Sequence, residues 1–84
     1  MKRKVALNGR NEIGGAIEHS LDEYFRKLDG EPANGLYDMV VGHVERTLLA
    51  TVMERAGGNQ TEAALMLGMN RNTLRVKLAR HKIL

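Results

Sequence analysis

Residues 58–75 read GNQTEAALMLGMNRNTLR and contain the start and stop signals of two short helices. Asn59 precedes the first helix, and Glu62 three residues later completes a capping-box arrangement in which each side chain satisfies a backbone N–H. Gly68 supplies the positive φ that ends this helix. Ala64 is small enough to lie where the two helices cross. The stretch therefore predicts two helices joined by a tight turn.

The second predicted helix has an inner and an outer side. Asn70 is its N-cap, and Met69, Leu74 and Leu78 lie about one turn apart on the inner side, where they pin the helix against its neighbour. The outer side carries Arg71, Asn72, Thr73, Arg75, Val76 and Ala79. This pattern predicts a helix-turn-helix over residues 59–82, whose second helix enters the major groove of DNA by its N-terminal turn.

The formal net charge of +3 is distributed in three blocks. Residues 1–10 carry +4, residues 11–56 carry −5, and residues 57–84 carry +4. The last block sets five basic residues against the single acid Glu62. Such a block is typical of a polyanion-binding element, because neutralising phosphates releases counterions. Two helices used only for packing would not need this charge, so we expect the block to bind DNA.

The residues before the helix-turn-helix begin with an arm and a first helix. Residues 1–11 show no periodic pattern and are expected to form a mobile basic arm. Over residues 12–28 the apolar side chains follow one helical stripe, which predicts the first helix. These side chains are Ile13, Ile17, Leu21, Tyr24, Phe25 and Leu28. Gly30 and Pro32 then end the helix in a turn.

The second helix, capped by Asn34 and ending at Ala56, is apolar over more than one stripe. Its apolar residues are Leu36, Tyr37, Val40, Val41, Val44, Leu48, Leu49, Val52 and Met53. Because a chain of 84 residues has a thin core of its own, we expect one face of this helix to form a dimer seam. Gly42 would permit a close backbone approach at a helix crossing. It is equally compatible with no role in packing. The predicted fold class is all-α, with four helices per chain in a homodimer.

The stretch from Gly58 to Arg75 resembles the C-terminal signature of the Fis family, named for the factor for inversion stimulation. The likeness covers roughly residues 13–84. Related sequences end the nitrogen-regulatory family of transcription activators. The resemblance implies an intertwined homodimer, in which residues 12–56 of each chain form a four-helix core and residues 59–82 form the DNA-binding unit.

The resemblance also implies how DNA is bound. Fis-family dimers hold their recognition helices closer together than the ~34 Å between successive major grooves, so the DNA must bend. This implies a sequence-tolerant, nucleoid-associated transcriptional regulator in the cytoplasm. Carried over by position, Asn70 and Arg71 meet base edges. The implied phosphate contacts are Asn59, Gln60, Thr61, Thr73, Arg75, Lys77 and Arg80.

The chain departs from the Fis pattern at several positions. Val76 and Ala79 stand where the family carries cations, and Glu62 replaces a base, so we expect a shallower salt dependence of DNA binding than in a fully basic relative. Thr47 stands where the family carries proline, and the second helix therefore lacks the usual cause of a kink. The arm is shorter than the hairpin region of the family, so we expect no stimulation of recombinase-catalysed inversion.

Other classes of function find little support in the residues. The chain has no Cys, its three His are scattered singly, and no grouping has catalytic or metal-ligating spacing, so we expect no enzyme activity, cofactor or metal. No apolar run approaches the ~20 residues of a membrane helix. The basic start is followed by too short an apolar stretch for a signal peptide, so we expect no export.

Two alternatives remain open. The helical core could dock on a recombinase or a transcription activator, with DNA contact secondary. The surface for such docking would hold Glu18, Asp22, Glu23 and Asp38. The chain could also be the detached output domain of an activator, although the initiating Met and the complete pattern up to Leu84 favour a whole protein.

Overall fold

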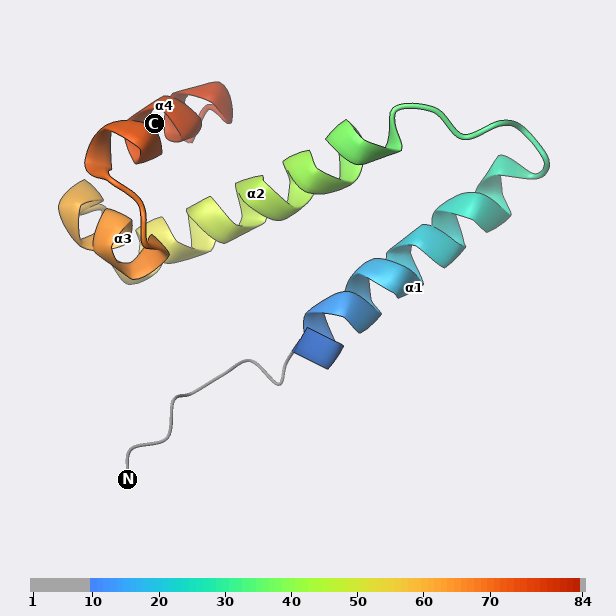
Figure 1. The fold of residues 1–84 in the computed structure, drawn as a ribbon, viewed down its shortest axis with the longest axis horizontal. Helices are drawn as coiled ribbons and strands as arrows, with labels where there is room; N and C mark the ends of the chain where they lie inside the picture. The colour runs from blue at the N-terminus through green and yellow to red at the C-terminus, as the bar shows by residue number, and fades with distance from the viewer. Residues whose placement is uncertain (1–9, 84) are drawn as a thin grey trace. The chain divides into compact units, whose positions relative to one another are not determined.

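The computed structural model of the chain describes residues 10–83 and contains four helices and no strand in that span. The helices are α1 (Arg10–Leu28), α2 (Leu36–Arg55), α3 (Gln60–Leu67) and α4 (Arg71–Arg80), as Figure 1 shows. The all-α fold class with four helices is thereby confirmed. The predicted arm lies outside the described residues up to residue 9, and its last two residues belong to α1 rather than to the arm. The chain forms two compact units, Met1–Asn34 and Gly35–Leu84.

The first unit consists of α1 and the start of the following turn. The apolar stripe predicted for this helix is partly accessible, because Ile13 and Phe25 are 48% and 49% exposed and its other members are half-buried. Tyr24 and Phe25 meet edge to face, with ring centroids 5.7 Å apart. After α1, Asp29 and Gly30 both have positive φ, at 49° and 89°, which confirms the turn predicted there.

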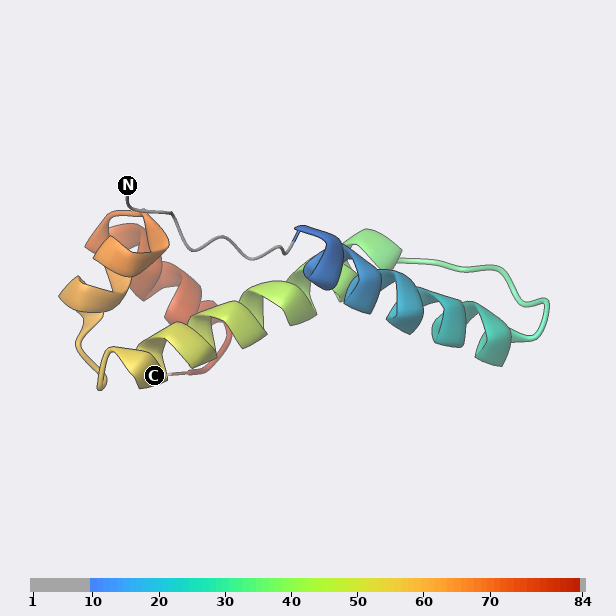
Figure 2. The same ribbon diagram turned by 90° about the horizontal axis from the view of Figure 1, so that it is seen from below.

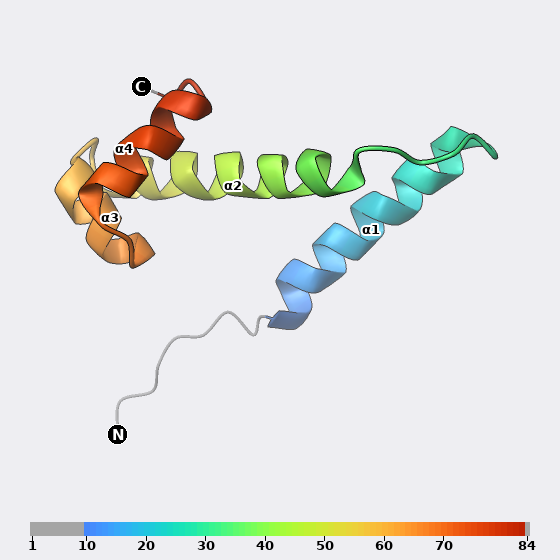
Figure 3. The same ribbon diagram turned by 45° about the horizontal axis from the view of Figure 1, so that its top comes forward.

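The second unit has a small apolar core to which three helices contribute. Figures 2 and 3 show α3 and α4 gathered at the C-terminal end of α2. The buried residues are Leu49 and Met53 of α2, Ala63 and Ala64 of α3, and Leu74 and Leu78 of α4. The two alanines let the helices approach closely, and the leucines fill the space between them. This packing confirms the inner side predicted for the helix-turn-helix.

The turn between α3 and α4 closes as the sequence predicts. Gly68 has φ 77°, its amide donates to the carbonyl of Leu65 at 3.2 Å, and the amide of Met69 donates to the carbonyl of Ala64 at 3.1 Å. These two bonds form a Schellman motif, which satisfies the last carbonyls of α3 and needs a left-handed residue at Gly68. Gly57, with φ 63°, ends α2 in the same conformation.

Two predicted caps differ from the structure. Asn34 does not cap α2, because the N-cap residue is Gly35, which has φ 68° and offers no side chain to the helix. The capping box of α3 is only half formed. Asn59 Oδ1 accepts from the amide of Glu62 at 3.0 Å as predicted, but the amide of Asn59 donates to the carbonyl of Ala56 at 3.1 Å. That turn bond leaves the Glu62 side chain without the amide it was expected to cap.

One face of α2 carries an exposed apolar stripe. Its members are Tyr37, Val41, Val44 and Leu48, at 77%, 43%, 42% and 50% exposure. Their spacing of four, three and four residues puts them on one side of the helix. Leu49 and Met53 are buried against α3 and α4, so α2 has two apolar faces, as predicted. Within residues 10–83, no helix combines the length and the hydropathy needed to span a lipid bilayer.

Candidate nucleic-acid interface

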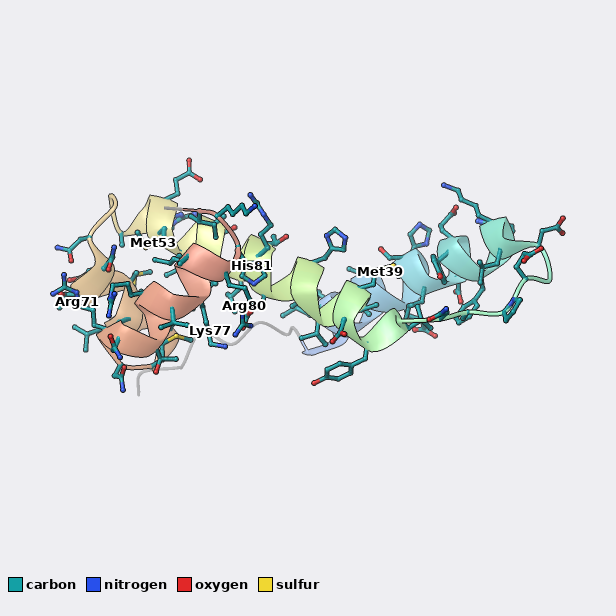
Figure 4. The ribbon with its side chains drawn as sticks, turned by 90° about the horizontal axis from the view of Figure 1, so that it is seen from above. Met39, Met53, Arg71, Lys77, Arg80 and His81 are labelled. Carbon is teal, nitrogen blue, oxygen red and sulfur yellow. The ribbon has the colours of Figure 1, made fainter. Side chains whose placement is uncertain are left out.

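The outer side of α4 carries exposed polar and basic residues from end to end. Arg71, Asn72, Thr73, Arg75 and Arg80 are all exposed. Figure 4 shows Arg71 at one end of the helix and Arg80 at the other. The helix sequence RNTLRVKLAR contains no acid, and its only buried residues are two leucines on the inner side. A helix of this kind offers positive charge along one accessible face, which is what a polyanion requires.

Asn70 and Arg71 lie together at the N-terminus of α4. Asn70 Oδ1 accepts from the amide of Thr73 at 2.8 Å, which confirms Asn70 as the N-cap. The Asn70 oxygen is therefore used inside the protein, and its Nδ2 group remains to donate to an outside acceptor. Arg71 is the first residue of the helix and is exposed, so its guanidinium extends from the end that would enter a groove first.

Asn72 belongs to the outer side predicted for this helix, but no DNA contact was predicted for it. Its Oδ1 accepts from the guanidinium of Arg75 at 2.5 Å, and together with Arg71 these two residues line a shallow hollow. Asn72 also lines a second hollow beside Thr73. The spacing of three residues on one helix was the signal in the sequence, because residues at i and i+3 are neighbours on a helix surface.

The residues predicted at the start of α3 differ in exposure. Asn59 and Thr61 are exposed, whereas Gln60 is half-buried and its Oε1 atom is enclosed without a hydrogen-bond partner among residues 10–83. The side chain of Asn59 is engaged as the cap of α3. Of the three, Thr61 is therefore the one whose side chain is both exposed and outside the cap.

Lys77 and Arg80 lie at the border between the outer side of α4 and the side that meets α2. Lys77 Nζ is 2.9 Å from Glu45 Oε2, and Arg80 is 3.6 Å from Glu45 Oε1. His81 Nε2 lies 2.8 Å from that same Oε1 atom. Hydrogen bonds from His81 and then Lys77 hold the pKa of Glu45 below its ordinary value, although burial acts in the opposite direction.

Sequence reasoning missed Glu45, because nothing local connects it with α4. The pairs with Lys77 and His81 span 32 and 36 residues of chain, and they form only when the apolar core sets α4 beside α2. Most of the predicted phosphate contacts are exposed, but Lys77 is half-buried like Gln60. In the described part of the chain, no three His, Cys, Asp or Glu side chains come together as they would around a metal ion.

Comparison with known proteins adds a second line of observation. A family model described as "Bacterial regulatory protein, Fis family" matches residues 41–81. A Ralstonia nicotianae chain named as a Fis-like DNA-binding protein is 56% identical over 75 residues, which are 89% of this chain and 97% of the relative. A chain named likewise from Neisseria meningitidis serogroup B is 51% identical over 73 residues, 87% and 92% of the two chains. The DNA-binding protein Fis of Escherichia coli O1:K1 is 47% identical over 66 residues, 79% and 67% of the two chains.

Proposed function

Because this chain belongs to the Fis family of bacterial regulatory proteins, we propose that it binds double-stranded DNA as a homodimer, with α4 in the major groove. Relatives that the chain covers almost completely are named as DNA-binding. The observation that carries the proposal is the surface of α4, which combines exposed cations with a complete absence of acids over its ten residues. Phosphate neutralisation by such a face supplies affinity for any duplex.

The N-terminal turn of α4 is where we propose that bases are read. Arg71 can donate to the O6 and N7 atoms of guanine with both arms of its guanidinium, and Asn70 can donate through the Nδ2 atom that its cap leaves unused. The phosphate contacts would lie on either side of this turn. They comprise Asn59, Gln60 and Thr61 at the start of α3, and Thr73, Arg75, Lys77 and Arg80 along α4.

The homodimer is supported by the exposed stripe on α2. Tyr37, Val41, Val44 and Leu48 form an apolar face that α3 and α4 leave uncovered. A second copy of the chain can bury this face against its own, because an interface with two-fold symmetry uses the same patch twice. The amphipathic α1, with Ile13 and Phe25 about half exposed, offers further apolar surface for the same assembly.

A dimer of this kind would present two copies of α4 to one duplex. We propose that the pair bends the DNA, as the family resemblance implies, and that deformability contributes to the choice of site. Loose sequence preference of this kind suits a nucleoid-associated regulator of transcription that acts at many sites. Contact with a recombinase or with the transcription machinery would be an additional activity of the dimer.

The experiment is a gel shift on prebent and straight duplexes with the wild type, Arg71→Ala and the control Lys27→Ala. The control removes one positive charge from an exposed position on α1. Loss of a bidentate base contact should cost Arg71→Ala about 1–3 kcal/mol of binding free energy, whereas the control should bind like the wild type. No binding by the wild type would refute DNA binding. Equal losses in both variants would refute base reading by Arg71, and equal wild-type affinity for the two duplexes would refute bending.

A further inference from the structure

A single carboxylate of α2 faces three basic side chains at the C-terminal end of α4. The two Glu45 oxygens divide these partners: Oε2 accepts from Lys77 at 2.9 Å, and Oε1 lies 2.8 Å from His81 and 3.6 Å from Arg80. Figure 4 shows Lys77 and Arg80 of α4, and His81 directly after it, near one another. Two of them, Lys77 and Arg80, are phosphate contacts in the proposed function, so the same cations have two candidate partners.

Lys77 stands between the carboxylate and the outer face of α4. It lines a groove together with Glu45, Arg80 and His81, in which Asp38 is a second acid. It also lines the outer hollow formed with Thr73 and Val76 on the accessible side of the helix. A lysine has a flexible four-carbon stem and a compact ammonium head, so rotation of the stem can carry the charge from one side to the other.

The pairing with Glu45 is better sheltered than an ordinary surface ion pair. The side chains of Glu45 and Lys77 are 24% and 27% exposed, whereas Arg80 is 63% exposed. A half-buried pair is screened less by salt than an exposed one. The positive charge counted along the sequence of α4 is therefore larger than the charge available to DNA. Glu45, which is 32 residues from Lys77 in the chain, lies against the basic side chains of α4.

We propose that Glu45 competes with DNA phosphate for Lys77 and, more loosely, for Arg80. This inference rests on the proposed DNA binding. In the free protein the carboxylate takes the place that a phosphate oxygen would occupy, and binding of DNA requires Lys77 to exchange one anion for the other. Glu45 thereby lowers the affinity for any duplex and reduces the net positive charge that α4 brings to the phosphates, without touching the base contacts at the other end of the helix.

The test is the salt dependence of DNA binding in Glu45→Gln, a variant that keeps the shape and removes the charge. Freeing Lys77 for one more phosphate should steepen the slope of log K against log salt by about 0.9. At about 0.1 M salt the variant should bind roughly three to ten times more tightly than the wild type. The gain should be the same on unrelated duplexes, because a phosphate contact carries no sequence information.

Three variants complete the design. Glu54→Gln removes a charge from an exposed position of the same helix and should leave the slope unchanged, which excludes an effect of net charge alone. In Glu45→Gln combined with Lys77→Met, the slope should return to that of the wild type. Glu45→Ala is a second neutral variant, used with melting curves in case the glutamine variant does not fold.

The outcomes separate this inference from the proposed function. If the wild type binds no duplex, DNA binding itself fails. If the wild type binds but both folded neutral variants bind with the same or a shallower slope, Glu45 is no competitor. Weaker binding by these variants would instead mean that the carboxylate positions Lys77 for its phosphate, and that result would overturn the inference.

Discussion

The side chain of Asn70 accepts a hydrogen bond from the backbone amide of Thr73 at 2.8 Å, and this contact fixes the first turn of α4. The same residue stands at the point where the helix would enter a DNA groove. Its oxygen stabilises the fold and its Nδ2 group is available to a base edge. One side chain therefore serves both helix capping and the proposed base contact. Substitutions at this position can separate them.

Asn70→Asp should preserve the fold and weaken DNA binding. Aspartate caps a helix about as well as asparagine, and its charge is favourable at a helix N-terminus. It has no donor, however, and it would bring a negative charge to the bases and phosphates. We expect an unchanged melting temperature and a loss of DNA affinity of about 5- to 150-fold in a gel shift, on the order of 1–3 kcal/mol. Asn34→Asp, the same change at an exposed position outside the proposed DNA contacts, serves as the comparison variant and should bind like the wild type. Wild-type affinity in Asn70→Asp would show that Asn70 does not meet DNA.

Leu74→Ala should destabilise the protein far more than Val76→Ala. Leu74 is fully buried between α2, α3 and α4, and truncating a buried leucine costs about 2–5 kcal/mol. Val76 is on the outer side and 53% exposed, so its truncation should change the free energy of unfolding by only about 0.5 kcal/mol. Urea denaturation followed by circular dichroism measures both. Similar losses in the two variants would contradict the inner and outer assignment of α4.

Sequence reasoning succeeded where a structural feature depends on a few neighbouring residues. The cap at Asn70, the left-handed Gly68 and the division of α4 into two sides follow from spacings of three or four residues. The helix-turn-helix is built almost wholly from such local features. Its fold and its exposed face are therefore predictable from the sequence alone.

The sequence did not predict features that depend on competition between neighbouring residues for one cap position, or on contacts between residues far apart in the chain. Asn34 is a good cap, but Gly35 adopts the left-handed conformation next to the helix and displaces it by one residue. The contact of Glu45 with Lys77 depends on how α4 packs against α2, and no spacing rule connects residues so far apart. The contact between Asn72 and Arg75 could have been predicted, because residues three apart on a helix are neighbours on its surface.

The stability that Glu45 contributes should disappear in acid. Its pKa is lowered from the ordinary value of 4.5, mainly by hydrogen bonds from His81 and Lys77, so the folded state holds this proton less tightly than the unfolded state. A lowered pKa contributes stability that is complete above the unfolded value and is lost as the pH falls through the folded value. The wild type should therefore exceed Glu45→Gln in urea midpoint at neutral pH.

The difference between these midpoints should shrink as the pH falls below about 4.5, the value at which the unfolded carboxyl takes up its proton. Every other carboxyl group is common to the two proteins, so the difference isolates Glu45. Denaturation series at neutral pH and at several steps below this value provide the measurement. A difference that stays constant across the whole range would show that the ion pairs make no contribution to stability.

Gly42→Ala should raise stability without changing association, whereas Leu48→Glu should weaken association between chains. Gly42 lies seven residues before Leu49, on the side of α2 that faces the core, and a Cβ atom added there meets nothing within 4 Å in the single chain. Alanine should therefore stabilise the helix by up to about 1 kcal/mol and leave association unchanged. Leu48 is 50% exposed on the proposed dimer stripe, where a charge should shift the sedimentation equilibrium towards single chains. Dissociation of Gly42→Ala would reveal a partner backbone crossing at the glycine, and an intact dimer of Leu48→Glu would move the seam away from this stripe.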